Sequence, residues 1–396
     1  MTTTAASPGP SPRRRSSAIP LGIGLALVLS ACTTGPAPRE TPSAAPAATT
    51  TPASSPEATP GSDLIVYDND WNASGATSVL PLLAADDVTV LGVTTVTGDA
   101  WATEGTAAAL SFFEKIGTTD VPVAEGRLYP LINTPALMST REALYGAKTS
   151  WKGAFTPSED DPDAPAVSPS DVPELPFGAA QSLAPAPLDA VDFMIEQVRA
   201  HPGEVTIVTA GPLTNVAAAV RKDPEFAGLA KAIVIGGGNL YQLSPGETDP
   251  EFNSSEGFNF RFDPESAHIV LTAGWPAITA LGDVTDTVVL DDALMASITS
   301  ETTPASEYTS AAAYVGNPLW DETVTAVAVD PGLITQSIQV RMDVDISEGP
   351  LYGSARVWSE ADAPGLGEGL VTLVQGIDAD GVADAFVDST HATFGD

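Results

Sequence analysis

Short β-branched strands alternate with amphipathic helices along most of this chain. The first part of the pattern predicts strands at residues 64–68, 88–96 and 121–124, separated by helices at 73–85 and 102–116. Strands joined through helices run parallel in one sheet, and continuously apolar strands belong to a sheet covered on both faces. The sequence therefore predicts an α/β fold with a mainly parallel central sheet and helices on both faces.

A break in this alternation extends from residue 126 to 187. Residues near 156–187 are rich in proline, aspartate and serine, which is typical of a long surface excursion. The alternation then resumes, with a helix at 188–200, a strand at 205–209, a helix to 221, strands at 232–235 and 277–281 around a helix at 264–273, two or three helices within 291–330, strands near 338–346 and 351–358, and a closing helix around 382. Because both parts show the same pattern, we interpret residues 63–396 as a single large domain.

The N-terminal 62 residues resemble an export signal followed by a tether. Three arginines at 13–15 precede an apolar stretch at 19–28 and a Leu-Ser-Ala-Cys box that ends at Cys32. This order is typical of a bacterial lipoprotein signal. It predicts that residues 1–31 are removed, that Cys32 receives a lipid, and that the protein is extracytoplasmic and anchored to the bacterial cell membrane. Residues 32–62 have the composition of a disordered tether.

Composition and the lack of certain motifs exclude several kinds of chemistry. The 51 acidic and 16 basic residues give a net charge of −35, which repels nucleic acid. The single cysteine excludes an intrachain disulfide and a cysteine-based metal site. The glycine triplet at 236–238 lacks the residues of a phosphate-binding loop, and no serine-centred elbow is present. Carboxylates remain as the groups best able to perform chemistry.

Polar side chains follow several of the predicted strands. They are Asp68, Asp70, Asp99, Asn239 and Asp283, and Asp321 stands at the start of a later helix. The carboxyl ends of parallel strands face one side of a sheet, where ligands bind. Converging carboxylates repel each other unless they are protonated or share a hard cation such as calcium. The alternative is structural: a strand-end turn at residues 68–71, and capping of the following segments by Asp99 and Asp283.

Seven short motifs occur in order between residues 63 and 340. They are residues 64–70 (LIVYDND), 90–99 (VLGVTTVTGD), 121–126 (VPVAEG), 211–215 (GPLTN), 258–265 (FNFRFDPE), 283–285 (DVT) and 320–321 (WD). In this order they resemble the inosine-uridine preferring nucleoside hydrolase family. The Asp-Asn-Asp-Trp opening, with residues 131–135 and 151–155, resembles a divergent branch of that family.

The resemblance implies hydrolysis of the N-glycosidic bond of ribonucleosides, for salvage at the cell surface. In the family a calcium ion holds the ribose diol and the attacking water, and an aspartate takes the proton. By position, Asp70 would be general base and metal ligand, with Asp321 and the carbonyl of Ala210 as further metal ligands. The implied substrate contacts are Asp68, Asn69, Asp99, Asn239, Asn259 and Trp320. Trp320 favours a purine because its indole can stack on the base. The family also implies a possible homo-oligomer.

Two departures from the family pattern leave the activity open. The family has two adjacent aspartates where this chain has Ser74 and Gly75, and a family glutamate is Gly257 here, beside Glu256. Loss of a carboxylate ligand should weaken calcium binding. The chain is therefore expected to be an exported nucleosidase. The alternative is a non-catalytic nucleoside-binding lipoprotein on the same fold, and release of free base distinguishes the two.

Overall fold

The computed structural model describes residues 51–52, 56, 59, 61–146, 151–161, 164–240 and 257–395. Residues 48–396 form one compact unit. The predicted signal peptide, Cys32, most of the predicted tether and Glu256 lie outside the described residues. Within the part of the chain that the structure describes, no helix is long and apolar enough to cross a membrane.

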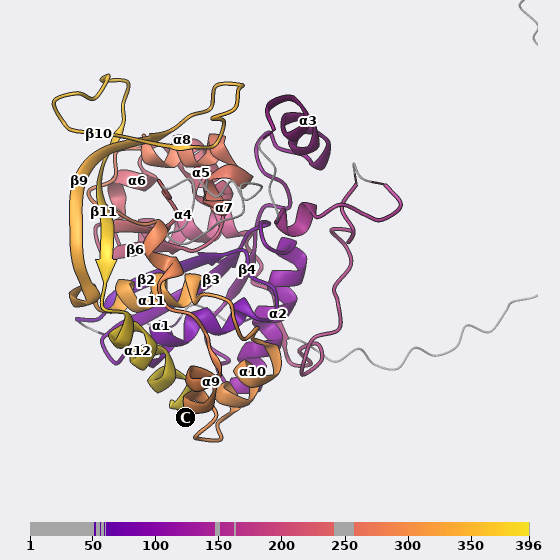
Figure 1. The fold of residues 1–396 in the computed structure, drawn as a ribbon. Helices are drawn as coiled ribbons and strands as arrows, with labels where there is room; N and C mark the ends of the chain where they lie inside the picture. The colour runs from indigo at the N-terminus through magenta and orange to yellow at the C-terminus, as the bar shows by residue number, and fades with distance from the viewer. Residues whose placement is uncertain are drawn as a thin grey trace, which may run out of the picture. The chain divides into compact units, whose positions relative to one another are not determined.

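A nine-stranded sheet forms the centre of the fold, in the order β10-β9-β11-β8-β7-β6-β2-β3-β4 (Figure 1). Its strands are β2 (Asp63–Asn69), β3 (Val88–Thr95), β4 (Val123–Glu125), β6 (Val205–Thr209), β7 (Ala232–Gly236), β8 (Ile278–Leu281), β9 (Ile334–Val344), β10 (Ala355–Trp358) and β11 (Gly369–Ile377). β9 runs antiparallel to β10 and β11, and the other neighbouring pairs are parallel. The predicted mainly parallel sheet is confirmed. A separate short pair joins β1 (Thr51–Pro52) to β5 (Leu183–Ala184).

Helices pack on both faces of this sheet, as predicted (Figure 1). The α-helices are α1 (Leu80–Ala84), α2 (Ala102–Ile116), α3 (Pro135–Tyr145), α4 (Ala190–Ala200), α5 (Thr214–Lys222), α6 (Phe226–Leu229), α7 (Phe258–Phe262), α8 (Pro264–Leu271), α9 (Asp292–Ile298), α10 (Pro304–Ala312), α11 (Trp320–Val329) and α12 (Ala379–His391). Short 3-10 turns are η1 (Gly75–Val79), η2 (Gly153–Phe155), η3 (Asp283–Asp286) and η4 (Pro331–Leu333).

Strand β2 shows how the two faces are built. Leu64 and Val66 pack into the apolar cluster that contains residues of α4, α5, α6 and α8. Ile65 and Tyr67 pack into a second cluster with residues of α1, α2, α10, α11 and α12. Successive side chains of a strand point to opposite faces. The residues that follow in the same strand, Asp68 and Asn69, therefore belong to different environments although they are adjacent.

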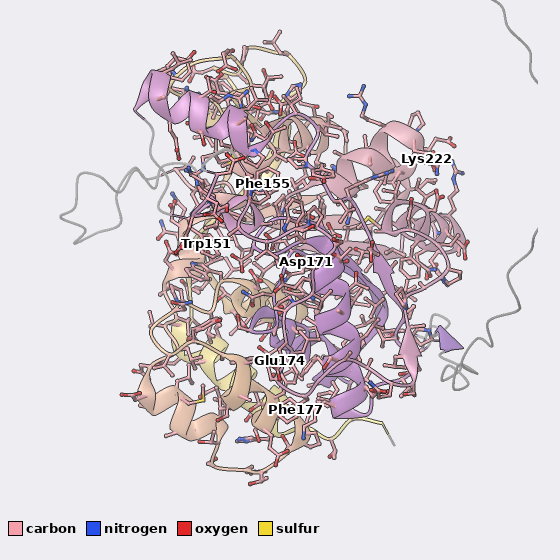
Figure 2. All side chains as sticks on the ribbon, turned by 90° about the vertical axis from the view of Figure 1, so that its right-hand side faces the viewer. Trp151, Phe155, Asp171, Glu174, Phe177 and Lys222 are labelled. Atoms are coloured by element: carbon pink, nitrogen blue, oxygen red, sulfur yellow. The ribbon has the colours of Figure 1, made fainter. Side chains whose placement is uncertain are left out.

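The predicted excursion near 156–187 lies along α2. The indole N–H of Trp101 donates to the carbonyl of Val167 over 2.9 Å, and the Ser111 hydroxyl donates to the carbonyl of Gly178 over 2.6 Å. Figure 2 looks onto this segment, where Asp171, Glu174 and Phe177 follow one another from the middle of the molecule to its lower end. The contacts of Trp101, which precedes α2, and of Ser111, within α2, hold residues 167 and 178 of the excursion against this helix.

Candidate active site

Asp70 lies immediately after the carboxyl end of β2, in a slot made of backbone. Its side chain is 4% exposed, and its Oδ2 accepts the backbone N–H of Asp99 over 2.7 Å. A Cβ added to Gly98 would lie 2.0 Å from this Oδ2, and a Cβ added to Gly211 would lie 2.9 Å from the Asp70 Cβ. Both neighbours must be glycine for the carboxylate to keep this place. The slot fixes the direction in which Asp70 points.

Asp321 stands in the first turn of α11 and shares the electrostatic environment of Asp70. Burial, followed by repulsion from Asp321 and Asp99, raises the pKa of Asp70 well above its usual range. Burial also raises the pKa of Asp321, and repulsion between the Asp321 and Asp99 carboxylates raises it further. The structure thus brings together the two carboxylates that the sequence predicts as metal ligands. Close carboxylates of this kind favour a shared proton or a bound cation.

The carbonyl of Ala210, predicted as a third metal ligand, lies where β6 ends. The Nδ2 of Asn259 on α7 donates to this carbonyl over 2.8 Å and to the carbonyl of Gly236 over 2.8 Å. Asn259 therefore joins the ends of β6 and β7. Its predicted contact with sugar hydroxyls stays a prediction, and so does the metal bond of Ala210.

Asp68 and Asn69 are fully buried at the end of β2, on its two opposite faces. The Oδ1 of Asp68 accepts from the Thr94 hydroxyl over 2.6 Å and from Asn215 Nδ2 over 2.8 Å. Burial raises the pKa of Asp68 to about 7. Both residues are bonded inside the protein in this structure, and their predicted substrate contacts stay predictions.

Asp99 is held by two side chains. Its Oδ2 accepts from Asn72 Nδ2 over 3.1 Å, and its Oδ1 accepts the indole N–H of Trp151. Asn72 in turn accepts from Ser74, from the backbone N–H over 2.8 Å and from the hydroxyl over 2.6 Å. Burial raises the pKa of Asp99. Ser74 thus joins a local hydrogen-bond network that ends at the Asp99 carboxylate.

The departure at Gly75 has a steric explanation. A Cβ at this position would lie 3.8 Å from Asp321 Oδ2, which places residue 75 beside the carboxylate site. The same Cβ would lie 2.7 Å from the Cβ of Trp71. Trp71 is 1% exposed, and its indole N–H donates to the carbonyl of Gly105 over 2.9 Å. A side chain at position 75 would therefore require the backbone around Trp71 or Gly75 to move, which favours glycine at this position.

The loop after β7 carries the predicted substrate residue Asn239. Gly257 packs against it so closely that an added Cβ would lie 1.9 Å from Asn239 Oδ1. Asp283 accepts the backbone N–H of Leu240 over 3.0 Å and therefore holds residue 240, the last described residue after β7. Asn239 lies next to the segment that carries Asn259, and its sugar contact stays a prediction.

Trp320 presents an exposed ring next to Asp321. It is 45% exposed, and its indole N–H donates to Asp286 Oδ1 over 2.7 Å. The hydrogen bond orients the ring without covering it. An exposed, oriented indole can stack on a flat ligand.

Glu322 is a site residue that the sequence reasoning missed. Its carboxylate is buried, and its Oε1 accepts from the Thr77 hydroxyl over 3.3 Å. Burial and the neighbouring Asp321 raise the pKa of Glu322 to about 8. The sequence does place a second acid directly after Asp321. An acidic side chain is unusual on the buried side of a helix, and this could have drawn attention to Glu322.

The oxygen donors of this site fit a hard cation, although the site has fewer carboxylates than the family pattern. Asp70 and Asp321 offer carboxylates, and Ala210 offers a carbonyl. Oxygen ligands of these types suit calcium. Within the described ranges, no three acidic, histidine or cysteine side chains are arranged to hold a metal ion together. The protein therefore offers two carboxylates and relies on neutral oxygens for the remaining ligands.

Carboxylates at the strand ends of a parallel sheet can activate water, which is chemistry that suits a hydrolase. Residues 65–384 match the family described as inosine-uridine preferring nucleoside hydrolase. The chain belongs to this family, and the enzyme class that comes with it is that of the nucleosidases. Catalysis in the family depends on a metal ion.

Similar proteins include both uncharacterised and named relatives. The chain is 30% identical over 318 residues to the uncharacterized protein C800.11 of Schizosaccharomyces pombe, a match that covers 74% of this chain and 76% of the relative. It is 31% identical over 229 residues to uridine nucleosidase 1 of Arabidopsis thaliana, covering 58% of this chain and 59% of that enzyme. The chain thus spans about three fifths of the plant enzyme.

Among solved structures, the purine-preferring ribonucleoside hydrolase from Gardnerella vaginalis shares the fold. The TM-score is 0.64 at 22% identity, and the match covers 83% of this chain and 98% of that one. A plant nucleoside hydrolase, PpNRh1, gives a TM-score of 0.64 at 23% identity, covering 83% of this chain and 99% of that one. Both confirm the α/β fold.

Proposed function

We propose that this protein cleaves the N-glycosidic bond of ribonucleosides to give ribose and free base, with Asp70 as general base. The observation that carries the proposal is the fixed, buried Asp70 carboxylate beside Asp321 at the strand ends. A raised pKa makes Asp70 a stronger base than a free aspartate, and a well-positioned base contributes about 10²- to 10⁴-fold to a rate.

In this mechanism Asp70 takes a proton from the attacking water. The water oxygen bonds to the anomeric carbon as the bond to the base nitrogen breaks, and the base leaves with the electron pair and takes up a proton. The sugar becomes positively charged in the transition state, and the negative charges of Asp70, Asp99 and Asp321 favour that charge. Substrate binding places the anomeric carbon within reach of the water held by Asp70.

A calcium ion is the metal that we propose for this site, held by Asp70, Asp321 and the Ala210 carbonyl. When bound, it supplies orientation of the sugar hydroxyls and a lower pKa of the water. Asp321 and Ala210 would then act as fixed ligands that keep Asp70 and the sugar in constant positions relative to each other.

We further propose a preference for purine nucleosides, supported by the exposed and oriented Trp320 ring. Stacking of a base on an aromatic side chain contributes about 1 to 3 kcal/mol, and the larger purine surface gains more. Replacing Trp320 with alanine should therefore lower kcat/KM for inosine and guanosine by about 5- to 100-fold, with a smaller effect on uridine. Trp320→Phe, which keeps a ring, should retain most of the purine activity.

Free base released from inosine, adenosine, guanosine and uridine tests both proposals. Release by the wild-type protein supports nucleosidase activity. Nucleoside binding by calorimetry without release of any base would instead identify a binding protein. An equal loss for uridine and inosine in Trp320→Ala would refute the purine preference.

We also propose that the protein is exported and anchored by a lipid on Cys32, on the strength of the signal-like residues 1–32. The wild-type protein, expressed in a bacterial host fed radiolabelled palmitate, should carry the label and sediment with membranes. Cys32→Ala should lose both the label and the sedimentation. Equal labelling of the two proteins would exclude Cys32 as the lipidated residue.

A further inference from the structure

Asn69 connects the first strand of the domain to a helix near its C-terminal end. Its side chain leaves β2 on the face opposite to Asp68 and is fully buried. Its Nδ2 donates to Oδ2 of Asp321 over 3.0 Å, across 252 residues of sequence. This hydrogen bond to a charged acceptor fixes one oxygen of the Asp321 carboxylate.

Two hydroxyl groups lie beside the Asn69 amide nitrogen. Its Nδ2 lies within hydrogen-bond distance of the Tyr67 hydroxyl, and it donates to Ser78 Oγ over 3.3 Å. The two hydroxyls also bond each other over 2.8 Å. The amide nitrogen thus lies between strand β2, turn η1 and helix α11.

The other end of the amide shows why this orientation matters. Asn69 Oδ1 is buried and has no hydrogen-bond partner in the structure. A buried polar atom without a hydrogen-bond partner lowers stability. The observed orientation therefore cannot be explained by hydrogen bonding of every polar atom of the amide. Turning the amide over would place Oδ1 against the Asp321 oxygen, and two acceptors would then repel each other. The donor end faces Asp321 because the carboxylate requires it.

We propose that Asn69 is a positioning residue, which holds the Asp321 carboxylate in the orientation needed for a bound cation and the sugar. The inference rests on the proposed nucleosidase function. With Gly75 in place of a carboxylate, the site has fewer anionic ligands, so the orientation of the remaining ones determines more of its affinity. Groups that orient metal ligands in this way typically change metal affinity or activity by about 10- to 100-fold when they are removed.

Asn69→Leu removes the donor while keeping a side chain of similar size. Asn69→Thr is a second, more conservative variant that keeps a hydroxyl near Ser78 but ends one bond earlier, short of Asp321. Both should raise the calcium dissociation constant, measured by calorimetry, by about 10- to 100-fold, with a matching loss of kcat/KM that excess calcium partly restores. Ser78→Ala is the matched control, because it disturbs the same hydrogen-bond network without touching Asp321. It should lower the melting temperature while calcium affinity stays within about threefold of the wild type.

A crystal structure of Asn69→Thr separates this inference from the proposed function. If the wild type releases no base from any nucleoside, the function fails, yet the Asp321 carboxylate should still be displaced in the variant. An Asp321 carboxylate that keeps its wild-type orientation would overturn the inference. So would calcium affinities of both Asn69 variants that match that of Ser78→Ala.

Discussion

Asp70→Asn should lower kcat for nucleoside hydrolysis by about 10²- to 10⁴-fold, because the amide cannot accept the proton of the attacking water. Substrate affinity should change less, since the amide keeps the shape of the carboxylate in its slot between Gly98 and Gly211. Steady-state release of base at saturating nucleoside measures the effect on kcat directly. Activity within tenfold of the wild type would exclude Asp70 as the general base.

Stability provides the control for this variant. Because burial and neighbouring carboxylates raise the pKa of Asp70, the folded state binds a proton that the unfolded chain releases near pH 4. The contribution of Asp70 to the stability of the metal-free wild type is therefore lost as the pH rises from about 4 through the raised pKa. Asp70→Asn lacks this contribution, so with a chelator its melting temperature should fall less between pH 5 and pH 8. A variant that melts lower than the wild type at every pH would indicate a folding defect.

Calcium should raise the melting temperature and the activity of the chelator-treated protein, and Asp321→Asn should remove most of both effects. A ligand that binds only the folded state at 100 times its dissociation constant adds about 2.7 kcal/mol to the free energy of unfolding. Asp321→Asn keeps the size of the side chain but loses the charge that attracts the cation. Thermal unfolding across a calcium titration at pH 7.5, with magnesium in parallel, measures the effect.

Asp283→Asn is a suitable control for this titration. It makes the same change of charge at the same edge of the sheet, but Asp283 is bonded to the backbone N–H of Leu240. The calcium-induced shift should persist in this variant. A wild-type protein that responds to neither cation would contradict the calcium proposal, and an unchanged response in Asp321→Asn would remove Asp321 from the ligand set.

Local sequence patterns predict much of the sheet because its central strands are continuously apolar. β2, β3, β6 and β7 occur within two residues of the ranges expected from the sequence. The positions of Asp70 and Asp99 at strand ends follow directly from these strands. The pattern does not reveal β11, which has glycines at 369 and 376 and pairs with both β8 and β9. It also does not reveal α3, because Met138 is the only residue of that surface helix buried in the structure, so no apolar period is visible.

Contacts between distant segments could not be predicted from these patterns. The bond from Asn69 to Asp321 depends on which face of β2 meets α11, and adjacent residues of a strand point to opposite faces. The presence of Gly75 where the family has an aspartate is understandable only from the folded structure, because an added Cβ would clash with the Cβ of Trp71. Family resemblance identifies the positions that differ, whereas the packing explains the difference.

The slot around Asp70 extends the functional constraint to positions that carry no functional group. Gly98 and Gly211 carry no side-chain functional group, yet a methyl group on either would meet the Asp70 side chain. A search for this site in related chains should therefore require glycine at these two positions as strictly as it requires the acid. A chain that keeps Asp70 but has a larger residue beside it would retain the chemical group without the geometry that makes it a base.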